Sequence, residues 1–352
     1  MLLLVSKFIL ISLYVFLCLC NLSDGKNMQE ILSVPAILVF GDSYADTGNN
    51  NYIDTMFKAN FLPYGKDFMG GVPTGRFSNG KIISDVFAEG LGVKEYLPPY
   101  LDPSIQINDL LTGVCFASAG SGYDPQTTNQ TRAIPMLDQL DLFKEYLGKL
   151  ETNIGEEAAK EIITNNVFLV VASTNDMLFS LPASGLPDDV YDSMLVNLTL
   201  SFVQELYKLG ARKIGVFSAP PVGCLPVERT LEGGLLRMCA ENQNQQAQIF
   251  NNMLKGQLPI LESNLPQSRI AFVDFYNPLI SIINNPEQYG LEVTNRGCCG
   301  TGLIEFSYTC NQLVGTCPDD SKYLFFDSGH LSEIGCYIFA NLTLPGLVEN
   351  LF

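Results

Sequence analysis

The sequence contains a single histidine, His330, in the stretch "FFDSGHLSEIG". Asp327 precedes it by three residues. At that spacing, in a tight turn, the carboxylate can meet Nδ1 of the imidazole and leave Nε2 to accept a proton. A lone histidine at a helix start also fits a surface or capping role. The pair is therefore a candidate acid and base for activating a nucleophile.

Ser43 is the candidate nucleophile. It ends the apolar run "AILVFGDS", which has the pattern of a buried strand in a parallel sheet. Ligands bind at the carboxyl ends of such strands, although Gly-Asp-Ser alone is equally typical of a turn or a helix start. Two further strand ends offer oxyanion donors, namely the backbone of Gly120 in "FASAGSG" and the side-chain amide of Asn175 in "ASTND". Each also fits an ordinary turn or cap.

The elements that must position these residues are five short apolar segments with helix-length spacers. They predict strands at residues 36–43, 113–120, 166–174, 212–220 and 269–275. Strands that alternate with helices predict an α/β fold, here a three-layer α/β/α sandwich with a five-stranded, mainly parallel sheet. The spacer 44–112 is rich in Gly, Pro, Asn and Tyr. We expect it to supply substrate contacts.

Residues 1–25 have the pattern of a secretory signal peptide. We predict cleavage near residue 25, a single domain over residues 26–352 and secretion from the cell, with an uncleaved anchor as the alternative. After signal removal no integral membrane segment is expected. The formal net charge of −17 argues against nucleic acids and anionic membranes as partners. Three sequons are candidate glycosylation sites: Asn129, Asn197 and Asn341.

The chain has ten cysteines, of which Cys18 and Cys20 lie in the predicted signal peptide. An even number of remaining cysteines in a secreted chain predicts disulfides, although sequence alone leaves the pairing open. A metal site is the alternative, but secretion and the lack of a second histidine argue against it. We expect neither a metal nor another cofactor.

Four stretches occur in a fixed order along the chain: "FGDSYADTGNNN", "GVCFASAGSG", "STND" and "FFDSGH". Together they resemble the four sequence blocks of the plant GDSL esterase/lipases, within the SGNH hydrolases. The resemblance covers nearly the whole mature chain, and "GGVPTGRFSNGK" and "GYDP" are most similar to the extracellular lipase subgroup. It implies a flavodoxin-like SGNH hydrolase fold and a location in the apoplast or cell wall.

The resemblance also implies a role for each candidate residue. Ser43 matches the nucleophile, and its own N–H joins the oxyanion hole. Gly120 and Asn175 match the other two oxyanion donors. Asp327 and His330 match the orienting acid and the general base.

Three residues depart from the family pattern. Tyr44 replaces a leucine, with little expected effect on mechanism, and Cys115 replaces an asparagine. Ser173 stands where a glycine usually precedes Thr-Asn-Asp. We expect Ser173 to matter most, because its Cβ would shift Asn175 and weaken the oxyanion hole.

The resemblance and the local spacing favour a disulfide between Cys224 and Cys239. Four further cysteines are expected to pair among themselves around the loop before His330: Cys298, Cys299, Cys310 and Cys317. Cys115 and Cys336 then remain, either bridged to each other or as free buried thiols.

We therefore expect a secreted serine esterase or lipase that cleaves carboxylic esters, with lipid acyl esters as the substrate class, through an acyl-serine intermediate. The alternatives are an acyltransferase, a polysaccharide acetylesterase, or a catalytically weak binding protein on the same scaffold. An α/β-hydrolase is disfavoured because the sequence contains no Gly-x-Ser-x-Gly motif. The sequence does not predict the oligomeric state.

Overall fold

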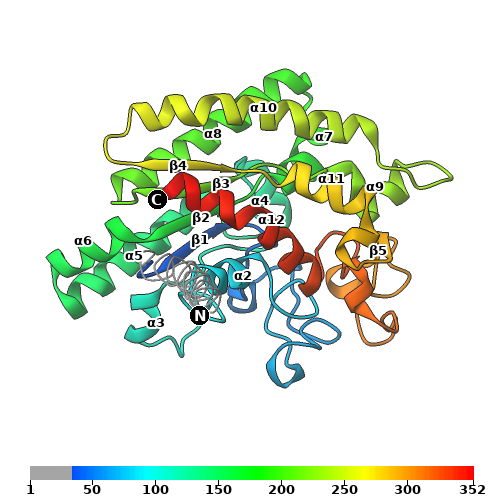
Figure 1. Cartoon of the computed structure of the whole chain (residues 1–352), viewed down its shortest axis with the longest axis horizontal. Coiled ribbons are helices and arrows are strands. Elements are labelled where there is room, and N and C mark those ends of the chain that lie inside the picture. The colour runs from blue at the N-terminus through cyan, green and yellow to red at the C-terminus, as the bar shows by residue number, and fades with distance from the viewer. Residues whose placement is uncertain (1–33) are drawn as a thin grey trace, which may run out of the picture. The chain divides into compact units, whose positions relative to one another are not determined.

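A parallel sheet of four strands lies at the centre of the fold (Figure 1). The strands are β1 (Ile37–Gly41), β2 (Val167–Val171), β3 (Lys213–Phe217) and β4 (Arg269–Val273), and they lie side by side in that order. Every residue of β1 and β2 is buried, as expected for a parallel sheet covered on both faces. The computed structural model describes residues 34–352, so the predicted signal peptide and its cleavage region lie outside the described residues.

The predicted strand at residues 113–120 is not a regular strand, so the expected count of five is wrong for the main sheet. The segment runs parallel to β1 along its outer edge, but only Cys115 pairs there, with Val39 on one side and Pro99 on the other. The backbone bonds to β1 are few: Val39 N–H donates to the Val114 carbonyl, and the N–H groups of Phe116 and Ser118 donate to the carbonyls of Val39 and Gly41. The α/β class and the parallel direction of the strands are confirmed. Isolated bridges at Cys115 hold residues 113–120 at the edge of the sheet.

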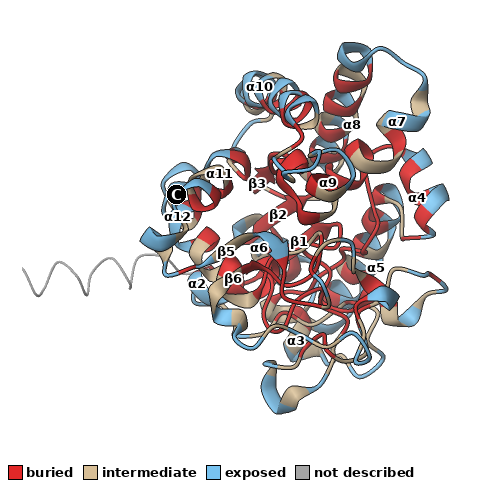
Figure 2. Cartoon of the chain, turned by 90° about the vertical axis from the view of Figure 1, so that its right-hand side faces the viewer, coloured by how far each residue is buried: buried red, intermediate tan, exposed pale blue. Residues whose placement is uncertain are grey.

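Helices cover both faces of the sheet. One face carries α2 (Ile83–Gly90) and α12 (Glu333–Leu351), and the other carries α5 (Met136–Ile154), α8 (Asp188–Lys208) and α10 (Glu241–Ser263). The ring of Phe40 in β1 packs 5.6 Å from Phe143 of α5, whereas Phe217 of β3 packs 6.2 Å from Phe339 of α12. In Figure 2 the strands are buried while the outer sides of α8 and α10 are exposed. The predicted three-layer arrangement is confirmed.

Shorter elements surround this framework. The helices are α3 (Ile107–Thr112), α4 (Pro125–Thr131), α6 (Glu156–Asn165), α7 (Leu181–Ser184), α9 (Pro226–Leu231) and α11 (Tyr276–Asn284). The 3₁₀ turns are η1 (Asn49–Tyr52), η2 (Met69–Gly71), η4 (Val222–Cys224), η5 (Pro286–Tyr289), η6 (Ser307–Thr309) and η7 (Asp320–Lys322), and η3 (Asp176–Ser180) is a π-helix. A second parallel pair consists of β5 (Val293–Gly297) and β6 (Tyr323–Phe325). Among the helices of residues 34–352, none has the length and apolarity needed to cross a bilayer.

Disulfides hold the loops at the carboxyl edge of the sheet. One joins Cys224 to Cys239, between the start of α9 and the start of α10. Two more close the segment between β5 and β6: Cys298–Cys317 and Cys299–Cys310.

No disulfide joins Cys115 and Cys336, so the bridged alternative is wrong and both are free, buried thiols. Cys115 lies beside β1, where its Sγ contacts the carbonyl oxygen of Ala45 at 3.1 Å. Cys336 lies in the first turns of α12, on one of the helical layers.

Candidate active site

Ser43 lies directly beyond the carboxyl end of β1, as the strand pattern predicts. Gly41 ends the strand with φ at +139°, and a Cβ at this position would come within 1.9 Å of the Val171 carbonyl oxygen. Only glycine allows β1 and β2 to stay this close. The Asp42 N–H then donates to that same carbonyl at 2.9 Å, so the chain turns sharply and presents Ser43 at the edge of the sheet.

Three side chains form a continuous hydrogen-bonded series at this edge. His330 Nε2 lies 2.8 Å from Ser43 Oγ, and His330 Nδ1 lies 2.8 Å from both carboxylate oxygens of Asp327. The turn predicted from the Asp327 to His330 spacing is present, because Asp327 Oδ1 accepts the backbone N–H groups of Gly329 and His330 at 2.8 Å each. The arrangement leaves Nε2 as the ring nitrogen that faces the serine.

Neighbouring aromatic residues hold this series in place, and the sequence interpretation missed them. Tyr64 is fully buried, and its hydroxyl donates to Asp327 Oδ2 at 2.7 Å. The Phe77 ring lies 4.7 Å from the imidazole. Tyr44 donates to the Gly329 carbonyl at 2.7 Å, so the residue after the nucleophile is tied to the histidine turn. No local pattern marks Tyr64 or Phe77, because each meets the histidine turn only after the long spacer has folded.

The side chain of Asn175 lines the same cavity as Ser43 and His330. Its Nδ2 donates one hydrogen bond, 2.9 Å long, to the Ser121 carbonyl, which leaves its second N–H for another acceptor. Gly120 lies one residue before Ser121 with φ at +90°, and a Cβ there would come within 2.9 Å of Thr131. Within residues 34–352, the backbone N–H groups of Ser43 and Gly120 have no hydrogen-bond acceptor.

Ser173 has a strained backbone, as its departure from glycine suggests. Its φ is +102°, it is fully buried, and its hydroxyl has no hydrogen-bond partner among the described residues. Asn175 nevertheless keeps its bond to Ser121. The backbone strain at Ser173 is therefore present, but the Asn175 amide, which the serine was expected to displace, still lines the cavity.

Asp46 and two asparagines join the first block to the second, and the sequence interpretation did not assign them this role. Asp46 accepts the N–H of Ala119 at 3.0 Å. Asn49 Nδ2 donates to the carbonyls of Cys115 and Ala117, and Asn50 Nδ2 donates to that of Ala119 at 2.8 Å. The run of asparagines in "FGDSYADTGNNN" was the sequence feature from which this role could have been predicted.

Several carboxyl groups behind the nucleophile are buried with raised pKa values. Burial raises the pKa of Asp42 to about 8, that of Asp176 to about 7 and that of Asp46 to about 6. Asp42 Oδ1 accepts the Tyr44 N–H at 3.0 Å, but Oδ2 is buried without a partner in the described chain. Asp42 is therefore neutral over most of the acidic pH range.

The cavity beside Ser43 has a volume of about 320 Å³ and is mainly apolar. Its apolar walls are Phe57, Leu178, Phe179, Leu225, Val227, Leu231 and Phe306. Glu228 also lines it, and burial raises the pKa of this carboxyl group. Of the spacer 44–112, only Tyr44 and Phe57 line the cavity, so most of the wall comes from segments far from it in sequence.

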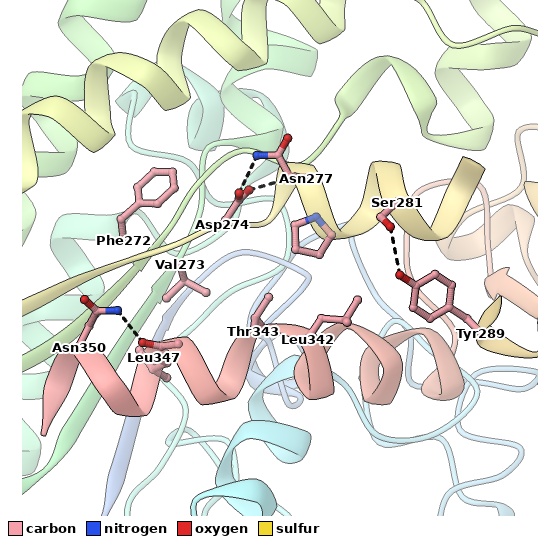
Figure 3. A pocket seen from close by; sticks show the side chains of 12 residues that line it. Phe272, Val273, Asp274, Asn277, Ser281, Tyr289, Leu342, Thr343, Leu347 and Asn350 are labelled. Carbon is pink, nitrogen blue, oxygen red and sulfur yellow. Dashed lines mark hydrogen bonds between the residues drawn. The ribbon is translucent and has the colours of Figure 1, made fainter. Parts of the chain in front are cut away.

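A larger hollow of about 470 Å³ lies between α11, α12 and the end of β4 (Figure 3). Asp274 accepts from Asn277 at 2.7 Å, and Ser281 lies 3.1 Å from the Tyr289 hydroxyl. The side chains of Thr343 and Asn350 donate to backbone carbonyls of α12. These groups have partners and include no nucleophile with a base. The cavity at Ser43 is therefore the candidate active site.

The fold has three layers, and its central parallel sheet presents a serine, a histidine and an aspartate in hydrogen-bonded series at its carboxyl edge. This is the arrangement of a serine hydrolase. Residues 37–342 match the family model described as GDSL-like Lipase/Acylhydrolase. The chain belongs to this family, and by that membership it is a carboxylic ester hydrolase. The family resemblance inferred from the four sequence blocks is confirmed.

Relatives from Arabidopsis thaliana match over most of their length. The chain is 50% identical over 304 residues to the protein named GDSL esterase/lipase At3g14820, covering 86% of each chain. It is 46% identical over 323 residues to GDSL esterase/lipase EXL3, covering 90% of this chain and 89% of the relative. It is 42% identical over 351 residues to GDSL esterase/lipase At2g31540, covering 97% of both.

Proposed function

We propose that this protein is a secreted esterase or lipase that hydrolyses acyl esters through an acyl-Ser43 intermediate. The observation that supports this most directly is the 2.8 Å contact between His330 Nε2 and Ser43 Oγ. A serine hydroxyl is a weak nucleophile until a neighbouring base takes its proton. At this distance His330 can take that proton as Oγ attacks the ester carbonyl.

In the proposed mechanism the attack places a negative charge on the carbonyl oxygen. The N–H groups of Ser43 and Gly120 and the free N–H of Asn175 stabilise this oxyanion. His330 then gives its proton to the leaving alcohol, and the same steps with water release the acid and restore the serine. Asp327 orients the imidazole and stabilises its charged form.

The apolar wall of the cavity supports a lipid acyl group as the part of the substrate that it binds. Aromatic and aliphatic side chains surround a space of about 320 Å³ beside Ser43. Such a space favours a hydrocarbon chain over a carbohydrate, which requires many hydrogen-bonding partners. For this reason we favour a lipid ester over an acetylated polysaccharide.

Secretion through the predicted signal peptide and glycosylation complete the proposal. Asn129, Asn197 and Asn341 are all exposed, so each sequon is accessible to modification. Enzymatic removal of N-linked glycans from the secreted protein, followed by mass analysis, would identify the occupied sites. A protein that stays inside the expressing cell without glycans would contradict this part of the proposal.

The activity can be tested with p-nitrophenyl esters from acetate to long acyl chains. Ser43→Ala and His330→Ala should each abolish nearly all turnover, and a fluorophosphonate probe should label the wild type but not Ser43→Ala. Ser201→Ala is the matched control, because Ser201 is an exposed serine on α8. Turnover of His330→Ala at the wild-type rate would refute the assignment. No turnover and no labelling of the wild type would favour a binding protein.

A further inference from the structure

Exposed apolar side chains stand on three segments that also supply wall residues of the cavity at Ser43. We define the apolar rim as Met56, Leu231, Leu235, Leu236, Met238 and Ile304, all of which are exposed. Leu235 and Leu236 expose 104% and 83% of their reference area. Single exposed leucines are ordinary, but several within one short loop mark a contact surface.

The rim is continuous with the cavity wall. Leu231 belongs to both, because it lines the cavity and is also exposed. Met56 directly precedes the wall residue Phe57, and Ile304 lies two residues before the wall residue Phe306. Two hydrogen bonds join these segments: Thr230 Oγ1 donates to the Leu303 carbonyl at 3.0 Å, and Ser307 Oγ donates to the Met56 carbonyl at 2.9 Å. The three segments therefore meet at one opening.

The loop that carries the leucines has a fixed base. Figure 1 shows it as the connection from α9 to α10 at the carboxyl edge of the sheet. The Cys224–Cys239 disulfide closes it. Arg237 Nη2 donates to the carbonyls of Pro226 and Asn295 at 3.1 and 3.0 Å, and Arg229 Nη1 donates to the Arg237 carbonyl at 3.1 Å. A loop anchored in this way holds Leu235 and Leu236 in solvent and cannot easily fold them inward.

We propose that the apolar rim docks onto the surface of an aggregated neutral lipid ester, so that an acyl chain passes from the aggregate directly into the cavity. This inference rests on the proposed function, because it assumes that the cavity binds the acyl group. Apolar side chains on a rigid protrusion partition into a lipid surface in proportion to the apolar area that they bury. The aggregate then covers the rim and supplies the substrate at the same place.

The charge of the chain favours this occupant over two others. A formal net charge of −17 opposes approach to an anionic membrane and opposes close contact between two copies of the chain. A second copy seated on the rim would also close the cavity, since Leu231 belongs to both surfaces. A neutral lipid surface does not repel the acidic chain, and it supplies the acyl chain that enters the cavity.

The test measures binding without catalysis. Ser43→Ala protein is mixed with emulsion droplets of triolein coated with phosphatidylcholine, and bound protein is separated by flotation. Adding Leu235→Ser and Leu236→Ser should reduce the fraction bound by at least about tenfold. Ile260→Ser is the matched control, because Ile260 is exposed near the far end of α10 and should bind as before. Replacing part of the phosphatidylcholine with phosphatidylglycerol should weaken binding.

A second measurement separates docking from chemistry. In the catalytically intact protein, the double leucine variant should hydrolyse dissolved p-nitrophenyl acetate at the wild-type rate, because neither leucine lines the cavity. It should lose at least about tenfold on the triolein emulsion. Equal flotation of the variant and its parent would overturn the proposal, as would a wild-type dimer that the leucine substitutions dissociate. Flotation without hydrolysis of any ester would leave the docking surface in place and refute the proposed function.

Discussion

Replacing Ser173 by glycine is expected to stabilise the protein. Ser173 is completely buried with φ at +102°. A side chain held at positive φ costs about 1–2 kcal/mol, and a buried hydroxyl without a partner costs about 1–3 kcal/mol more. Glycine removes both costs but loses about 0.5–1 kcal/mol more backbone entropy on folding. The free energy of unfolding should therefore rise by roughly 2 kcal/mol, or about 4 °C in Tm.

The assay is thermal unfolding of the wild type, Ser173→Gly and Ser173→Ala, followed by circular dichroism at one pH. Alanine removes the unpartnered hydroxyl but keeps the positive φ, so it should recover only about 1 kcal/mol. The difference between the two variants gives the backbone strain less the entropy cost of glycine. If Ser173→Gly unfolds at or below the wild-type temperature, the strain argument is refuted.

Turnover of the same variants tests the effect of Ser173 on Asn175. If the serine Cβ displaced that amide, glycine would raise kcat by a hundredfold or more, on the scale of one oxyanion donor. Asn175 keeps its 2.9 Å bond to Ser121 and faces the cavity. We therefore expect kcat to change by less than about threefold. A large gain would show that the serine impairs catalysis.

Two further predictions concern the groups behind the site. Tyr64→Phe removes the hydroxyl that donates to Asp327 Oδ2 at 2.7 Å, so kcat should fall by about tenfold with KM unchanged. An unaltered kcat in steady-state assays would exclude this positioning role. Folding raises the pKa of Asp42 from 3.8 to about 8, so its stabilising contribution is complete below pH 3.8 and is lost as the pH rises through about 8. Between about pH 5 and about pH 9 the free energy of unfolding of Asp42→Asn should consequently fall less than that of the wild type. An equal fall of Tm with pH in both proteins would contradict this.

Elements with a strong local pattern could be predicted from the sequence. The apolar runs of β1 and β2 are buried throughout and those of β3 and β4 mostly, and the spacers between the strands are long enough for helices, so the three layers follow from the pattern. The segment at residues 113–120 has the same apolar pattern but lies beside Pro99. One of its two pairing partners is β1 and the other comes from a loop, and a pattern confined to the segment itself carries no information about that loop.

The same distinction holds for the site. Asp327 and His330 are three residues apart, so their contact is local and the spacing predicts it. Ser43 reaches them from the other end of the chain, and the sheet topology brings it there. Tyr64 has no such signal, because its contact with Asp327 spans 263 positions and depends on how the long spacer folds. Residues that support others through single distant hydrogen bonds are the ones that sequence patterns miss.

The two parts of the site come from different kinds of structure, and this bears on how substrate choice can vary. The reacting groups stand on turns fixed by the sheet, with Gly41 held against β2 and Asp327 held by backbone N–H groups. Much of the cavity wall and of the apolar rim stands on residues 225–238, outside the sheet. Side-chain changes there alter the volume and apolarity met by the acyl chain, while the backbone bond from the Val227 N–H to the Ser328 carbonyl can be kept. The chemistry and the choice of ester are therefore separable in this fold.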